Sequence, residues 1–264
     1  EVKEIVPIIN INGPRFPVLG ALWQPRGGTA RHDAVAWGYA RKCSDYGIDI
    51  IEQCEVIGVK KKRDKIVGME TTKGHIKAKK VCFVVAGHSS VLADLAGFRL
   101  PIESVALQAL VSEPIKPIID CVVMANTVHG YLSQSDKGEL VIGGGADGYN
   151  NYSQRGSFLH IEETVRALVE TFPVISRLRQ LRQWGGIVDM TGDRSPIISK
   201  TPVDGLYINC GWGTGGFKAI PGSGWATAEM IYNEKPGKLA SPFSIDRFLE
   251  GRLIDESAAA AVAH

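Results

Sequence analysis

A glycine-rich run between an apolar strand and a helix-prone segment constrains the fold of this chain most. Residues 207–224 read Tyr-Ile-Asn-Cys-Gly-Trp-Gly-Thr-Gly-Gly-Phe-Lys-Ala-Ile-Pro-Gly-Ser-Gly. Glycine lets the backbone approach a ligand closely, and the N–H groups at a helix start attract electron-rich atoms. We expect a strand that ends at Cys210, a tight loop, and a helix that starts near Pro221. The run therefore predicts one wall of a nucleotide-cofactor site.

One cation, Lys218, stands in this otherwise uncharged run. A glycine-rich turn can also serve only to pack a strand against a helix. A lone cation, however, is costly to bury without an anionic partner. Lys218 therefore favours a ligand that carries negative charge.

The composition permits a cofactor enzyme and argues against several other classes. The chain has 264 residues, a formal charge of +2 and a hydrophobic fraction of 44%, which fit a globular protein of one or two domains. Its one basic cluster, residues 60–63, precedes Asp64 in an expected hairpin turn, so we predict no nucleic-acid binding. No apolar run has the length of a membrane span, and we expect no membrane association.

The cysteines and histidines predict neither disulfides nor a metal site. The five cysteines form no close pair, which indicates free thiols in a reducing compartment and a cytoplasmic protein. His88, His129 and His160 have no spacing that would gather metal ligands on one face, so we predict no bound metal.

The pattern of strands predicts a mixed α/β fold, with α/β and α+β parts in two domains. Residues 1–100 and 190–264 read as a discontinuous Rossmann-like domain, and residues 101–189 as an inserted, mostly antiparallel sheet with one helix over 158–172. The apolar run 81–87 is typical of a strand buried on both faces, with a ligand expected where it ends. An amphipathic helix over 29–46, stopped by Gly47, and a short helix over 89–97 complete the prediction.

Several motifs resemble those of the D-amino-acid oxidase and sarcosine oxidase superfamily of FAD-dependent oxidoreductases. The glycine run with Lys218 is similar to the C-terminal flavin motif of that superfamily. The closer resemblance is to the β-subunit family of heterotetrameric sarcosine oxidases, and matching segments run from end to end of the chain. The segments that carry it are 27–38, 86–92, 107–113, 195–202 and 253–264, while 184–189 and 193–196 belong with the glycine run to the superfamily motif.

The resemblance implies an activity, two cofactors and a set of partners. The domain formed by 1–100 and 190–264 would bind FAD non-covalently, and the sheet domain 101–189 would bind the substrate. Sarcosine would be oxidised to glycine with hydrogen peroxide and either formaldehyde or methylene-tetrahydrofolate. Oxygen is then the electron acceptor, tetrahydrofolate would act through a partner subunit, and the α, γ and δ subunits would complete the oxidase.

The resemblance also implies roles for particular residues. Lys218 would hold the substrate carboxylate, and Tyr131 would face the substrate, although a strand tyrosine could equally belong to the core. His32 would carry covalently bound FMN with Arg31 stabilising nearby negative charge, whereas a histidine at a helix start is otherwise read as a surface residue. The remaining residues expected to contact FAD are Val56, Ala86, Gly87, Gly211, Gly213, Thr214, Gly215 and Gly216.

One family feature has no match in this sequence. Residues 1–28 contain no Gly-x-Gly-x-x-Gly after a first strand, the motif that binds the pyrophosphate of a dinucleotide. We therefore expect the chain to correspond to about the C-terminal two-thirds of a subunit and to bind FAD weakly alone. Two other hypotheses stay open: a related oxidase or dehydrogenase acting on dimethylglycine, glycine or an opine, and an interaction scaffold without a cofactor.

Overall fold

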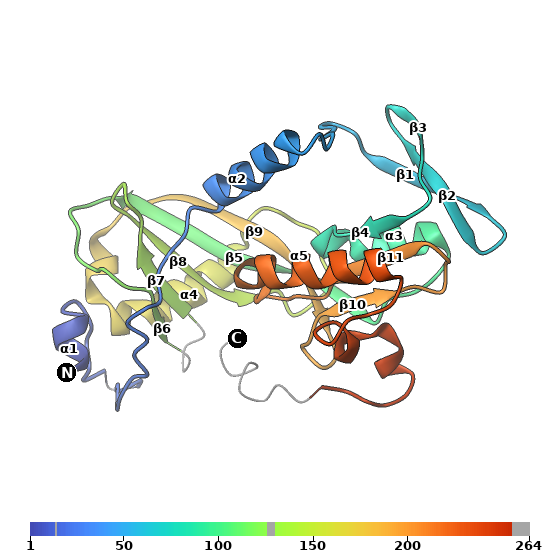
Figure 1. The fold of residues 1–264 in the computed structure, drawn as a ribbon. Coiled ribbons are helices and arrows are strands. Elements are labelled where there is room, and N and C mark those ends of the chain that lie inside the picture. Colours follow the sequence, from blue (N-terminus) through green and yellow to red (C-terminus); the bar gives the residue numbers. More distant parts are fainter. Residues whose placement is uncertain (14, 126–129, 255–264) are drawn as a thin grey trace.

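A five-stranded antiparallel sheet forms one end of the molecule in the computed structural model, which describes residues 1–13, 15–125 and 130–254 (Figure 1). Its helix, α4, packs on one face, where Leu110, Leu132, Ile142 and Leu168 share a core. The alternation of apolar residues along each strand explains this one-sided packing. In spatial order the strands are β6 (Val123–Ala125), β7 (Gly130–Gln134), β8 (Glu139–Ala146), β5 (Ile102–Pro114) and β9 (Gln180–Thr191), and α4 is Phe158–Thr171.

A second, three-stranded sheet lies at the other end of β5 and β9. Its central strand, β11 (Leu206–Cys210), runs parallel to β4 (Val81–Phe83) and antiparallel to β10 (Ile197–Lys200). Helix α5 (Gly216–Asn233) packs on it through Ala226 and Met230. Helix α3 (Ser89–Ala96) contributes Leu92 and Ala96 to a separate core with β11.

The third sheet projects away from the rest of the molecule (Figure 1). It is an antiparallel meander of β1 (Val56–Lys62), β2 (Lys65–Thr71) and β3 (Gly74–Lys77), and the charged turn at 63–64 joins its first two strands as expected. Ile66 and Met69 of this meander are buried in the core beneath β11, and Val56 and Val59 pack partly against it.

The N-terminal residues connect to the five-stranded sheet. Helix α1 (Val2–Ile5) is followed by Val6 and Ile9, both buried in the core that α4 shares with that sheet. Further along, helix α2 (His32–Asp45) ends where Gly47 adopts a φ of +71°, the left-handed conformation that glycine favours. None of the residues of α2 is buried. The division into two domains stays a prediction.

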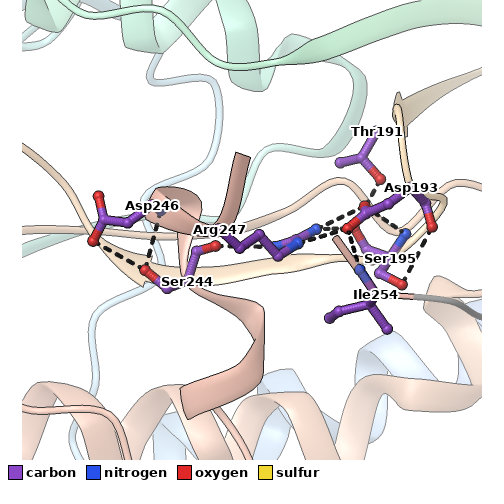
Figure 2. A network of polar contacts seen from close by, with 7 residues as sticks. All are labelled: Thr191, Asp193, Ser195, Ser244, Asp246, Arg247 and Ile254. Carbon is purple, nitrogen blue, oxygen red and sulfur yellow. Dashed lines mark hydrogen bonds and ion pairs between the residues drawn. The ribbon is translucent and has the colours of Figure 1, made fainter. Parts of the chain in front are cut away.

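The C-terminal segment is attached by a buried ion pair (Figure 2). Arg247 donates from Nε to Asp193 Oδ2 at 2.7 Å and from Nη2 to Asp193 Oδ1 at 2.9 Å, and both side chains are only 2% exposed. The same guanidinium donates to the carbonyl oxygens of Ser195 and Ser244. The segment carries the 3-10 turns η4 (Ser241–Phe243) and η5 (Ile245–Phe248), while η1 (Ala86–His88) and η3 (Pro173–Arg177) lie elsewhere.

The mixed α/β class is confirmed, but two local predictions were wrong. Helix α5 starts at Gly216 rather than near Pro221, which lies inside it, because the glycine loop ends directly in the first turn. The strand predicted over 81–87 ends at Phe83, since β11 pairs with only three of its residues, and Val84 is 63% exposed.

Candidate functional site

Two glycine-containing loops lie at the same edge of the sheet formed by β10, β11 and β4. Because β4 and β11 are parallel, their carboxyl ends point the same way, and a short loop follows each of them. After β4 comes the segment Ala86–Gly87, and after β11 comes the loop 211–215 that leads into α5. This is where open α/β sheets bind ligands.

The loop after β11 lies directly on the end of β9. Gly211 has a φ of +72° and Gly213 a φ of +51°, and a Cβ at either position would stand 2.7 Å from Thr191 Cγ2 or 2.8 Å from Met190 Sδ. The amide N–H of Gly211 donates to Asp189 Oδ2 at 2.6 Å. Gly213 N and Gly215 N donate to the carbonyl oxygens of Asp189 and Trp212. These three N–H groups are therefore used within the loop. The N–H groups in the first turn of α5, which have no intrahelical acceptor, are the ones that can donate to a ligand.

The segment after β4 lies on β9 as well. Ala86 has a φ of +46°, and Ser89 Oγ donates to its carbonyl oxygen at 2.5 Å. Gly87 is buried, and a Cβ there would stand 2.3 Å from Ile187 Cγ2. Its carbonyl oxygen accepts from Ser104 Oγ at 2.9 Å. Both candidate loops are thus fixed against one short stretch of β9, residues 187–191.

Lys218 lies in the first turn of α5 and is exposed, as is Thr214 in the loop before it. Its apolar neighbours Phe217 and Ile220 do not bury it, because they are themselves 47% and 36% exposed. Within the described ranges no ion pair includes Lys218. A cation at the positive end of a helix dipole is available for a bound anion rather than for an internal contact.

Tyr131 lies on the face of the five-stranded sheet opposite α4. Strand register aligns it with Gly143, Ala109 and Trp184 in one row across four strands. The phenol covers Gly143, because a Cβ there would be 2.3 Å from Tyr131 Cζ. Burial raises the pKa of Tyr131, and within the described part of the chain its hydroxyl has no hydrogen-bond partner. The open face therefore offers an unused hydroxyl in the same row as Trp184, which is 37% exposed and lies three strands away.

His32 is the first residue of α2, and its side chain is exposed. Arg31 next to it pairs with Asp33 at 3.2 Å and reaches Asp136, in the β7–β8 turn, at 3.8 Å. That turn is near the end of β5, whereas Gly211 is near its beginning. The structure therefore does not bring the predicted FMN anchor together with the glycine loop of α5.

The other residues singled out from sequence lie outside this arrangement. Val56 packs partly against the core beneath β11. His160 Nε2 lies 3.0 Å from the buried carboxylate of Asp147, and the ring of His88 stacks obliquely on Tyr152 at 5.2 Å. His129 lies outside the described residues. The described residues contain no cluster of metal-ligating side chains, and no helix among them is long and apolar enough to cross a membrane.

The start of α5 fits the ring of a flavin dinucleotide. The glycines at 87, 211 and 213 face β9, where a Cβ would meet Ile187, Thr191 or Met190, so they let both loops lie directly against the sheet. The start of α5 supplies a positive dipole end for the pyrimidine edge of the ring, which becomes negative on reduction. Fold and site together are typical of α/β proteins that bind a nucleotide cofactor at the carboxyl ends of parallel strands.

Comparisons with known proteins identify the family. The profile of the family described as "FAD dependent oxidoreductase" matches residues 1–230, and the chain belongs to this family. It is 71% identical to "Sarcosine oxidase subunit beta" of Rhodobacter capsulatus and 57% identical to the protein of that name from Arthrobacter. All of this chain is covered in both cases, and it spans 64% and 65% of the lengths of those relatives. The resemblance seen in the sequence is thereby confirmed.

The fold has a similar solved counterpart. The crystal structure of L-proline dehydrogenase from P. horikoshii superposes with a TM-score of 0.88 at 28% identity, covering 96% of this chain and 68% of that one. The mixed fold with its antiparallel sheet is therefore shared with a protein named as an L-proline dehydrogenase.

One residue of the site was missed by the sequence reasoning. Asp189 stands in the motif 184–189 that helped to carry the resemblance, but its contact with Gly211 joins positions 22 apart, and no local pattern predicts it. The sequence offered one signal, an acidic residue at the end of an otherwise uncharged strand segment, 184–188.

Proposed function

We propose that this chain is the flavin-ring and substrate portion of a sarcosine oxidase β subunit. The observation that carries the proposal is the 71% identity to such a subunit over all 264 residues. In the proposed reaction sarcosine, oxygen and water give glycine, formaldehyde and hydrogen peroxide. With tetrahydrofolate on a partner subunit, methylene-tetrahydrofolate replaces formaldehyde. FAD, when bound, accepts the two electrons removed from the N-methyl amine.

The residues of this chain bind and orient the substrate. Lys218 at the start of α5 pairs with the substrate carboxylate, a charge-assisted contact that fixes the amino acid in one orientation. Tyr131 donates its free hydroxyl from the open face of the sheet. The 211–216 segment would contact the flavin ring, and Ala86, Gly87 and Val56 would contact the adenine portion of FAD.

A second cofactor is proposed on His32. Its exposed imidazole at the start of α2 is free to carry FMN covalently, and Arg31 would neutralise negative charge on that group. Its separation from the glycine loop supports two distinct flavin positions rather than one. Placement of FMN near the surface would also suit reduction of oxygen there and contact with the α, γ and δ subunits.

The solved relative supports the substrate class. L-proline dehydrogenase is named for an α-amino acid with a secondary amine, and sarcosine is also an α-amino acid with a secondary amine. Both amino acids carry the carboxylate that Lys218 would hold. A cytoplasmic location stays part of the proposal.

The proposal is tested on the full-length enzyme co-expressed with its partner subunits. We expect sarcosine to reduce the bound flavin faster than dimethylglycine, glycine or an opine does, and denatured protein to retain yellow colour on the chain that carries His32. Faster flavin reduction by one of the other amines would identify that amine, rather than sarcosine, as the substrate. Absence of any flavin would favour the scaffold hypothesis.

Two variants assign the residues. His32→Ala should abolish the covalent flavin while substrate still reduces FAD, and covalent flavin that persists in this variant would rule out the anchor. Lys218→Met should weaken sarcosine binding about 10- to 100-fold, as for loss of one charged hydrogen bond. Lys235→Met, an exposed lysine beyond the other end of α5, is the matched control and should bind sarcosine normally.

A further inference from the structure

Asp189, near the end of β9, is a buried carboxylate that contacts the loop after β11. The residue is only 3% exposed. Its Oδ2 accepts from Gly211 N at 2.6 Å. Its main-chain oxygen accepts from Gly213 N at 2.9 Å. The same Oδ2 lies 3.5 Å from Ser89 Oγ, the first residue of α3, whose hydroxyl donates to the carbonyl oxygen of Ala86.

These contacts determine the path of the chain into α5. Gly211 and Gly213 both have left-handed conformations, which glycine adopts without strain, so the contacts with Asp189 and not a backbone preference select this path. Beyond them, Trp212 Nε1 donates to Asn209 Oδ1 at 2.5 Å, and Gly215 N donates to the Trp212 carbonyl oxygen. Helix α5 begins at the next residue, so the position of its first turn follows from the position of the loop.

The charge of Asp189 serves this loop rather than an ion pair. Burial raises the pKa of Asp189, although the hydrogen bond from Gly211 N lowers it. No ion pair among the described residues includes Asp189, whereas Asp193, four residues later, has a bidentate contact with Arg247. A desolvated carboxylate without a cation is costly and adds little stability compared with an apolar side chain. A buried carboxylate at this position therefore calls for a role other than stability.

We propose that Asp189 is a positioning residue: its carboxylate fixes the 211–213 loop and thereby places the first turn of α5, with Lys218, against flavin and substrate. This inference rests on the proposed function. Asp189 itself touches neither the cofactor nor the substrate and acts through the backbone of Gly211.

The test compares two buried aspartates in the flavin-loaded, full-length enzyme. Asp189→Asn keeps the size of the side chain and removes its charge, and Asp193→Asn does the same at the neighbouring site that is paired with Arg247. For Asp189→Asn we expect a shifted visible spectrum of the bound flavin and a Kd for sarcosine, from the concentration dependence of flavin reduction, raised at least about tenfold. For Asp193→Asn we expect a lower unfolding temperature with the wild-type spectrum and Kd.

Two results would overturn the role of Asp189. One is an Asp189→Asn enzyme with the wild-type spectrum and Kd, and the other is an equal change of spectrum and Kd in both variants. If Asp189→Asn does not fold, hydrogen exchange of the wild-type enzyme is the test. The amides of Gly211 and Gly213 should be protected from exchange as strongly as those of β11. Exchange of these two amides at the rate of an open turn would refute the role of Asp189. Wild-type enzyme without flavin contradicts the proposed function instead.

Discussion

Helices α4 and α2 are both 14 residues long, yet one is built into a core and the other lies uncovered. In α4 the apolar residues Ile161, Val165 and Leu168 recur every three or four positions and form one stripe against the sheet, which Phe172 continues just after the helix. In α2, Val35, Trp37 and Tyr39 recur every second position, which spreads them around the helix. The difference shows that a segment can form a helix without having a single face to bury.

Two ion pairs differ in the same way. The pair Arg247–Asp193, which attaches the C-terminal segment, has both side chains 2% exposed, whereas the pair Arg31–Asp33 at the start of α2 has side chains 59% and 51% exposed. Water screens the second pair and not the first. Burial, rather than the kind of residue, therefore decides what each contact contributes to stability.

The largest effect should come from breaking the buried pair. Arg247→Met keeps much of the side-chain volume but leaves Asp193 buried without a cation, which we expect to lower the free energy of unfolding by about 3–5 kcal/mol. Urea unfolding of the 264-residue chain measures it, with Arg31→Met as the control. Equal midpoints for the two variants would contradict the contrast.

A core truncation should come next. Leu168 of α4 is fully buried, and its side chain lies where a Cβ on Gly130 would approach within 3.0 Å. Leu168→Ala should cost about 3 kcal/mol because the cavity cannot collapse against a sheet. Unfolding in urea provides the value, and a loss of under about 1 kcal/mol would mean that the packing of α4 is looser than the structure indicates.

Acid should lower the free energy of unfolding by protonating Asp193. Arg247 lowers the pKa of Asp193 to about 2, against burial, from an ordinary value of 3.8. The stabilisation from this group is therefore complete above about pH 4 and is lost as the pH falls towards 2, a change of about 2 kcal/mol. Unfolding midpoints between pH 2 and 5 should show this loss in the wild type and not in Asp193→Asn. Asp189, whose pKa burial raises, acts in the opposite direction and is common to both proteins.

The smallest effect is expected in α2. Trp37 is 60% exposed, so Trp37→Ala should change the free energy of unfolding of this chain by no more than about 0.5 kcal/mol. Circular dichroism in urea gives the comparison with Leu168→Ala. A loss near 2 kcal/mol would show that α2 packs against a surface and would remove the contrast between the helices.

Local patterns predicted the parts of the fold that local physics determines. Gly47 stopped α2 where expected, the apolar alternation predicted the strands of the inserted sheet, and the glycine run predicted a loop between β11 and a helix. The start of α5 was misplaced because Pro221 suggested a first turn, whereas the preceding glycines already allow one.

Contacts between distant segments could not be predicted. Arg247 looks like a surface residue in sequence, and only its meeting with Asp193 explains its burial. Nor does any periodicity reveal that Asp189 reaches Gly211, or that Tyr131 lies over Gly143. Lys218 is exposed, although a buried cation was considered from the sequence. The exposure of this side chain depends on what covers α5 and not on its neighbours in the sequence.

The parallel pairing of β4 with β11 has a kinetic consequence. The entire five-stranded sheet lies between these two strands in the sequence, so their pairing closes a very long loop. Such non-local contacts form slowly, while the hairpins β5 to β8 and their helix α4 depend on nearer ones. We expect the sheet with α4 to become protected first during refolding and both cofactor loops to be assembled last. Cofactor capture would then report the final step of folding.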